Sequence, residues 1–124
     1  MKKLMTLTAG LFLLLLSLGA KAQTKTGADY FAGKWKFLVT GTPYGDLQRV
    51  YVLEKKDSTL TGVVQDWSGN EISKCSNVEV KDKEAILHYR ALGNDITITL
   101  TMIDEDHVNG NVLGMYEAKG ERVK

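Results

Sequence analysis

The residues of this chain that could bind a metal are few and far apart. The two histidines, His88 and His107, show no ligand spacing to a cysteine or to each other, so they do not predict a zinc site. Asp104-Glu105-Asp106 lacks the alternating oxygen ligands and the glycine of a calcium loop, and a solvated hairpin turn is its plainer interpretation. The sequence therefore predicts no metal site and no cofactor.

Residues for covalent or acid–base catalysis are equally scarce. The chain has no Gly-x-Ser-x-Gly motif and no phosphate-binding loop. Asp46 and Asp66 could in principle form the carboxylate pair of a glycosidase, which needs the two groups about 5–10 Å apart. We predict no catalytic residue and no enzyme activity, and an enzyme that uses Asp46 and Asp66 stays open as an alternative.

The single cysteine, Cys75, cannot form a disulfide within the chain. Its plainer interpretation is a small apolar residue of the core. An intermolecular disulfide or a reactive thiol stays open, but Lys74, its basic neighbour in sequence, would lie on the opposite face of a strand.

The first 22 residues predict export. Met1-Lys2-Lys3 is basic, Leu11 to Leu16 is the centre of an apolar run, and Ala20-Lys21-Ala22 has the small-x-small pattern of a cleavage site. We therefore expect a signal peptide over 1–22, since the apolar run is too short for a membrane-spanning helix. No cysteine follows the cleavage site, so we expect a protein without a lipid anchor, located in the periplasm or outside the cell.

The remaining part of the chain predicts one small domain. Removal of 22 of the 124 residues leaves 102, enough for one modest core. Loss of Lys2, Lys3 and Lys21 from the 16 basic residues leaves 13 against 15 acidic ones, a net charge of −2. This balance argues against nucleic acid and against insertion into or binding to an anionic membrane, because such partners select concentrated positive charge.

Alternation of apolar and polar residues predicts an all-β domain over 33–124, after a flexible N-terminal segment over 23–32. The clearest case is Ile96 to Met102, in which aliphatic residues or Met alternate with Thr. A short turn at Ala28 to Phe31 stays open within the flexible segment. The predicted strands are eight: about 33–41, 47–56, 59–67, 71–80, 84–91, 95–103, 107–115 and 118–124.

Short connections between these eight segments predict an antiparallel up-and-down meander. An open meander would expose two strand edges, and closing the last strand onto the first removes them. We therefore predict an eight-stranded barrel, a common size for small up-and-down barrels. A two-sheet sandwich is the alternative, although sandwiches usually need longer crossovers than this chain offers.

Gly33-Lys34-Trp35, at the start of the first predicted strand, resembles the Gly-x-Trp motif of lipocalins and related calycin barrels. In that family an arginine of the last strand packs over the tryptophan, and Arg122 stands at the matching place here. The resemblance covers 33–124 and implies a lipocalin-like barrel, similar to small exported barrel proteins of Gram-negative bacteria. It implies that Trp35 and Arg122 close the barrel as a cation–π pair, a structural role.

The two ends of the predicted barrel differ in character. Three turns at one end are short and charged, whereas the other end gathers Tyr44, Trp67 and Tyr116 beside glycines and polar residues. Ligand sites favour aromatic walls with a few polar groups and the mouths of barrels. Tyr51 and Tyr89 could add inward hydroxyls, although the alternation of their strands does not fix the face they occupy.

The function favoured by this pattern is non-catalytic binding of a small, partly apolar ligand at the aromatic end. The alternative is an interaction or accessory module that docks a protein or a polysaccharide through the same rim. In that case the interior would be filled by side chains, which is common in barrels this small.

Overall fold

The computed structural model describes residues 25–124, so the predicted signal peptide lies outside the described residues. The described part holds one short helix and nine strands: α2 (Gly27–Phe31), β1 (Gly33–Thr42), β2 (Gly45–Lys56), β3 (Thr59–Gln65), β4 (Glu71–Lys74), β5 (Asn77–Val80), β6 (Glu84–Ala91), β7 (Asn94–Met102), β8 (His107–Val112) and β9 (Tyr116–Arg122). No helix within 25–124 is long and apolar enough to cross a membrane.

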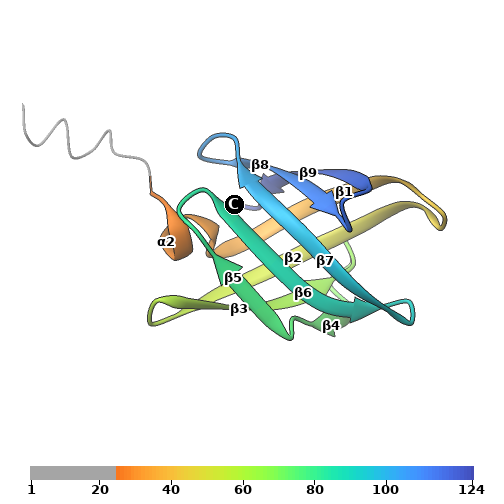
Figure 1. Cartoon of the computed structure of the whole chain (residues 1–124), viewed down its shortest axis with the longest axis horizontal. Coiled ribbons are helices and arrows are strands. Elements are labelled where there is room, and N and C mark those ends of the chain that lie inside the picture. Colours follow the sequence, from red (N-terminus) through yellow and green to blue (C-terminus); the bar gives the residue numbers. More distant parts are fainter. Residues whose placement is uncertain (1–24) are drawn as a thin grey trace, which may run out of the picture.

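The strands form one antiparallel sheet in the order β4-β3-β2-β1-β9-β8-β7-β6-β5 (Figure 1). The predicted all-β, up-and-down arrangement is therefore confirmed. The predicted pairing of the first strand with the last is also confirmed, because Trp35 lies opposite Arg122 and Val39 opposite Ala118 in the β1–β9 ladder.

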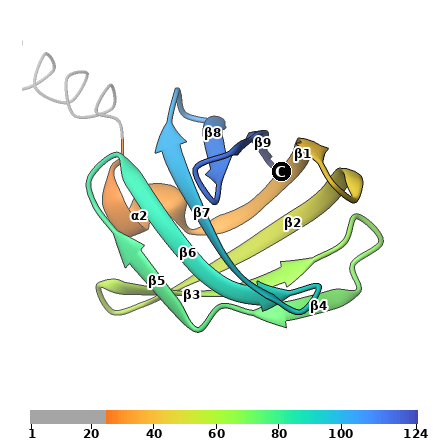
Figure 2. The same cartoon turned by 45° about the vertical axis from the view of Figure 1, so that its right-hand side comes forward.

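The predicted single strand over 71–80 is wrong, and the count is nine instead of eight. Its first half, β4, pairs with β3, and its second half, β5, pairs with β6. The chain crosses between them at Cys75 and Ser76, whose N–H groups donate to Gly62 and His88 carbonyls at 2.8 Å each. The crossing joins the two end strands of the sheet without a ladder between them, so the curled sheet is a partly closed barrel (Figure 2).

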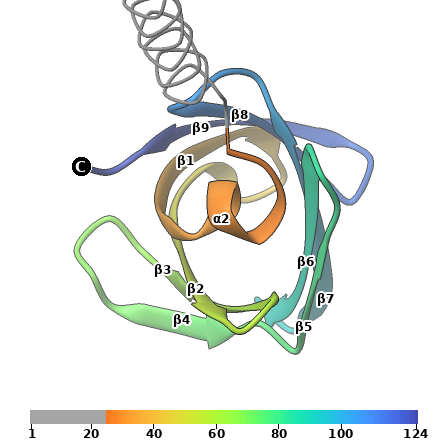
Figure 3. The same cartoon turned by 90° about the vertical axis from the view of Figure 1, so that its left-hand side faces the viewer.

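Helix α2 covers one end of this barrel. Figure 3 looks along the barrel from the side of α2, which lies within the ring of strands. Tyr30 and Phe31 are fully buried there, and Tyr30 donates its hydroxyl to the carbonyls of Asp104 and His107. The structure thus differs from the flexible segment predicted over 23–32, because two large aromatic side chains at its end complete the core.

The core fills the half of the barrel next to α2. Its largest side chains are Trp35, Tyr30, Tyr51, Phe31, Phe37, Leu87, Ile98 and Leu100. Phe37 lies flat against Gly110 and Gly120 of the two neighbouring strands, where a Cβ at Gly120 would come within 2.7 Å of its Cε1. These glycines therefore leave room for the Phe37 ring to lie across β9 and β8 on the inner face of the sheet.

Candidate functional site

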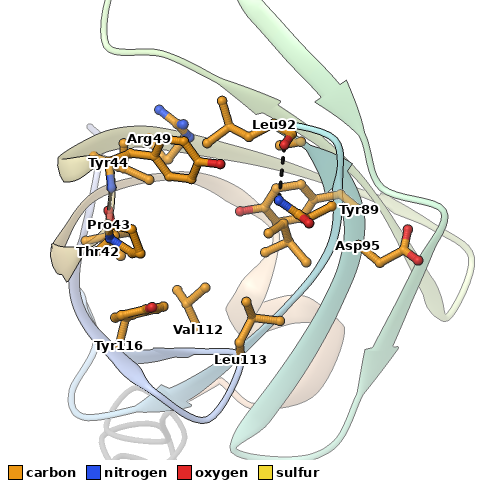
Figure 4. A pocket seen from close by; sticks show the side chains of 15 residues that line it. Thr42, Pro43, Tyr44, Arg49, Tyr89, Leu92, Asp95, Val112, Leu113 and Tyr116 are labelled. Atoms are coloured by element: carbon orange, nitrogen blue, oxygen red, sulfur yellow. Dashed lines mark hydrogen bonds between the residues drawn. The ribbon is translucent and has the colours of Figure 1, made fainter.

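A cavity of about 400 Å³ occupies the end of the barrel away from α2 (Figure 4). Ligand pockets commonly measure about 300–1,000 Å³ and have mostly apolar walls with a few polar groups. The apolar lining consists of Val39, Pro43, Leu47, Ala91, Leu92, Ile96, Val112 and Leu113. The remaining lining residues are Tyr44, Tyr89, Tyr116, Thr42, Arg49, Asn94 and Asp95.

Three hairpin turns form the mouth of the cavity. The β1–β2 turn carries Tyr44, whose N–H donates to the Thr42 hydroxyl at 3.2 Å and whose side chain is 62% exposed. Tyr116 begins β9 and lines the same side of the opening as Tyr44, with Thr42 and Pro43 between them in Figure 4. Both phenol rings therefore form part of the cavity rim.

The other two turns place a leucine in a left-handed backbone conformation at the mouth. Leu92 has φ of 54° and Leu113 has φ of 56°, and each is followed by a glycine that also has positive φ. These side chains are 52% and 44% exposed, yet both line the cavity. Asn or Asp usually holds such a turn position, because positive φ strains a larger side chain.

The floor of the cavity is a pair of buried tyrosines. Tyr89 lines the cavity, and its hydroxyl lies 2.8 Å from that of Tyr51, which is fully buried behind it. Burial raises the pKa of both hydroxyls, that of Tyr51 well above its ordinary value of 10. Both groups therefore stay protonated at neutral pH. One O–H bonds the partner oxygen, which leaves the second O–H free to donate elsewhere.

Arg49 is the residue that the sequence analysis missed. It lies on the inner face of β2, between Leu47 and Tyr51, and opposite Phe37 in the β1–β2 ladder. The period-two alternation of Leu47, Arg49, Tyr51 and Leu53 could have indicated it, since an arginine on the apolar face of a strand is unusual.

Trp67 does not join the cavity. Its indole N–H donates to the carbonyls of Phe37 and Arg49 at 3.1 and 3.3 Å, and Lys36 lies 4.1 Å from a ring centroid. Lys36 is exposed on the outer face of β1, so the indole lies on the outside of the barrel wall. The reason is local: after β3 the chain turns outward in a loop that the Asp66 side chain holds.

The Asp66 carboxylate forms hydrogen bonds within that loop. Its carboxylate accepts the N–H groups of Ser68 and Asn70, each at 2.9 Å. Hydrogen bonds from Asn70, with weaker ones from Ser68 and Gly69, lower the pKa of Asp66. Neither Asp66 nor Asp46 lines the cavity, so the two carboxylates considered for glycosidase chemistry do not share this site.

At the closed end, Arg122 lies over Trp35, with 4.2 Å from its Cζ to the ring centroid. Its guanidinium also donates to the carbonyls of Ala32 and Tyr30 at 3.1 and 2.9 Å. The Trp35 indole N–H donates to the carbonyl of Phe31 at 2.9 Å. The pair therefore ties the first and last strands to helix α2 and lies far from the cavity mouth.

Other ionisable residues form separate pairs. His88 contacts Glu79 at 2.7 Å, and His107 contacts Asp104 at 2.8 Å, both near the surface. Burial raises the pKa of the Cys75 thiol to about 11. Within 25–124 no three His, Cys, Asp or Glu side chains gather closely enough to hold a metal ion.

Of the five predicted ligand residues, the structure brings Tyr44, Tyr89 and Tyr116 to one cavity and places Tyr51 directly behind it. Trp67 lies outside. The sequence analysis did not single out Arg49, Leu92 or Leu113 as site residues.

No family model and no curated protein matches the chain. Among solved structures, a de novo designed fluorescence-activating β-barrel is similar over 77% of this chain and 96% of that chain, with a TM-score of 0.49 and 19% sequence identity. A likeness this distant says nothing about what this protein binds.

Proposed function

We propose that this protein binds a small, partly apolar ligand in the cavity at the open end of its barrel, without catalysing a reaction. The observation that carries the proposal is the cavity itself, about 400 Å³ with a mainly apolar and tyrosine lining. The opposite end is covered by α2 and filled by core side chains. Within the described residues, the cavity opens between the three hairpin turns.

The alternative of a docking module with a filled interior is less well supported. Side chains fill the half next to α2 but leave the other half hollow. A surface hollow of about 320 Å³ beside Trp67 and Lys36 is the feature that favours docking of a protein or polysaccharide. Trp67 is held there by two hydrogen bonds that also give it a structural role.

A non-enzymatic role agrees with the composition of the cavity wall. Asp95 is its only carboxylate, and Arg90 pairs with Asp95 at 2.9 Å. Such a wall offers apolar contacts and hydrogen-bond donors, but no pair of acids for glycoside hydrolysis.

We also propose that the protein is exported and lipocalin-like. The basic and apolar pattern of 1–22 supports removal of a signal peptide, and delivery to the periplasm or the medium. Gly33-Lys34-Trp35 and the Arg122 contact over Trp35 support the lipocalin-like part. Mass spectrometry of the mature N-terminus checks export directly, because the proposal requires Gln23 as the first residue.

The binding proposal is tested with N-phenyl-1-naphthylamine, a neutral apolar dye that gains fluorescence in apolar sites. We expect one dye molecule per protein, and we expect Tyr44→Ala to weaken its binding roughly five- to tenfold through loss of an aromatic wall. Trp67→Ala is the matched control, because it removes an aromatic residue outside the cavity and should leave dye affinity within twofold.

Two results would contradict the proposal. The first is a wild-type protein that does not bind the dye. The second is an affinity that falls for Trp67→Ala and not for Tyr44→Ala, which would move the site to the outer wall. Circular dichroism of each variant shows whether the fold is retained.

A further inference from the structure

Arg49 brings a positive charge to an otherwise apolar half-barrel. It is the only lysine or arginine among the residues that line the cavity. Its neighbours on the inner face of β2 are Leu47 and Tyr51, whereas the charged Glu54 of this strand is exposed on the outer face. Arg49 is partly buried, so its guanidinium loses part of its hydration, and an anionic partner would offset that cost.

Arg49 has no acidic partner within the described residues. The only hydrogen bond of its guanidinium found there runs from Nη1 to the backbone carbonyl of Gln48 at 2.9 Å, which uses one of five N–H groups. Asp95, the only acid of the lining, pairs with Arg90, and its side chain is 89% exposed. The cavity therefore retains an uncompensated positive charge.

The polar groups that the charge of Arg49 reaches include the Tyr51 and Tyr89 hydroxyls. The Tyr51–Tyr89 pair has one O–H left after its mutual hydrogen bond. The Arg49 charge lies close enough to oppose partly the rise in the pKa of both tyrosines, although burial dominates. Figure 4 draws Arg49 on the same side of the cavity as the Tyr44 phenol. A guanidinium with neutral phenols selects an oxyanion and rejects a cation.

We propose that the ligand is an apolar acid: a compact apolar body that carries one carboxylate or similar oxyanion, which Arg49 binds with the help of the Tyr89 hydroxyl. The body lies against the aliphatic wall, chiefly Val39, Ile96 and Val112. This inference rests on the proposed binding function and adds the chemical class of the ligand to it.

A matched pair of dyes tests the charge separately from the apolar body. 8-Anilino-1-naphthalenesulfonate is N-phenyl-1-naphthylamine with one added sulfonate. We expect Arg49→Met to lower the affinity for the anionic dye at least about tenfold, because one charge-assisted contact is lost. The affinity of Arg49→Met for the neutral dye should stay within threefold of the wild-type affinity. Arg49→Lys should keep part of the preference for the anion, and Arg49→Gln repeats the loss of charge with a polar side chain.

Lys56→Met is the control for overall charge. Lys56 ends β2 at the other end of the barrel and is exposed, so this change should alter neither affinity. If Arg49→Met and Arg49→Gln fold but bind both dyes as the wild type does, or weaken both equally, the inference about the acid is wrong and the binding function stands. If the wild type binds neither dye, the proposed function fails first, and the inference with it.

Discussion

Two leucines at the cavity mouth hold conformations that disfavour them. Leu92 and Leu113 both have positive φ, which costs a residue other than glycine roughly 1–2 kcal/mol. Both also present an apolar side chain to solvent at the edge of the cavity. Strain of this kind is often found where a side chain serves binding and not folding.

The two leucines should therefore reduce stability while they contribute an apolar contact to the cavity mouth. Leu92→Asn and Leu113→Asn should each raise the free energy of unfolding by about 0.5–1 kcal/mol, because Asn tolerates the left-handed conformation. Each substitution should also lower the affinity for N-phenyl-1-naphthylamine, because an apolar contact at the mouth is lost. Chemical denaturation and dye titration measure the two effects. A variant that is less stable than the wild type and binds the dye equally well would refute the idea.

Some of the site residues could be predicted from the sequence, and others could not. Tyr44 and Tyr116 could be placed at one end because a meander alternates its turns between two ends. Trp67 could not be placed, because the sequence does not show that the Asp66 side chain turns its loop outward. Arg49 was not predicted because the apolar Val50 and Val52 on the outer face of β2 obscure the alternation of its inner face.

At the scale of elements, the β1–β9 closure depends on one aromatic ring and two glycines. Phe37 projects from β1 onto Gly120 of β9 and Gly110 of β8. A larger residue at either position would crowd the Phe37 ring, although both glycines look like ordinary strand residues in the sequence. The close approach of ring and backbone therefore sets how tightly the barrel curls beneath the cavity.

Gly120→Ala should destabilise the protein by about 1–3 kcal/mol, because the added methyl overlaps the Phe37 ring. The sign is informative, since replacing glycine by alanine at an unstrained position normally stabilises a protein. Lys119→Ala, at the exposed neighbouring position, should change the unfolding free energy by less than about 0.5 kcal/mol. Equal stability of Gly120→Ala and wild type in chemical denaturation would contradict this packing.

Two elements could not be predicted correctly from local pattern. Residues 23–32 were predicted as a flexible segment, and a helix forms over Gly27–Phe31 because Tyr30 and Phe31 are buried at the end of the barrel. The segment over 71–80 alternates well enough for one strand, but it must leave β3 and join β6. Both outcomes depend on contacts with distant parts of the chain, whereas the other strands follow from their own alternation and turns.

At the scale of the whole molecule, the barrel is divided into two halves. The half next to α2 is a packed core tied by Trp35 and Arg122, and the other half is a cavity with turns around its mouth. The packed core and the proposed binding site thus lie at opposite ends of one small sheet. The order of the strands and the difference between the two ends follow from the sequence, whereas the hollow interior depends on side-chain volumes summed over many strands.

The most direct test of the central claim fills the cavity without touching the rest of the barrel. Ala91→Trp places an indole in the cavity from the inner face of β6, and Arg90→Trp adds the same group to the outer face of that strand. We predict that dye titration of folded protein shows at least tenfold weaker N-phenyl-1-naphthylamine binding for Ala91→Trp and wild-type binding for Arg90→Trp. Wild-type affinity in a folded Ala91→Trp protein would contradict the account.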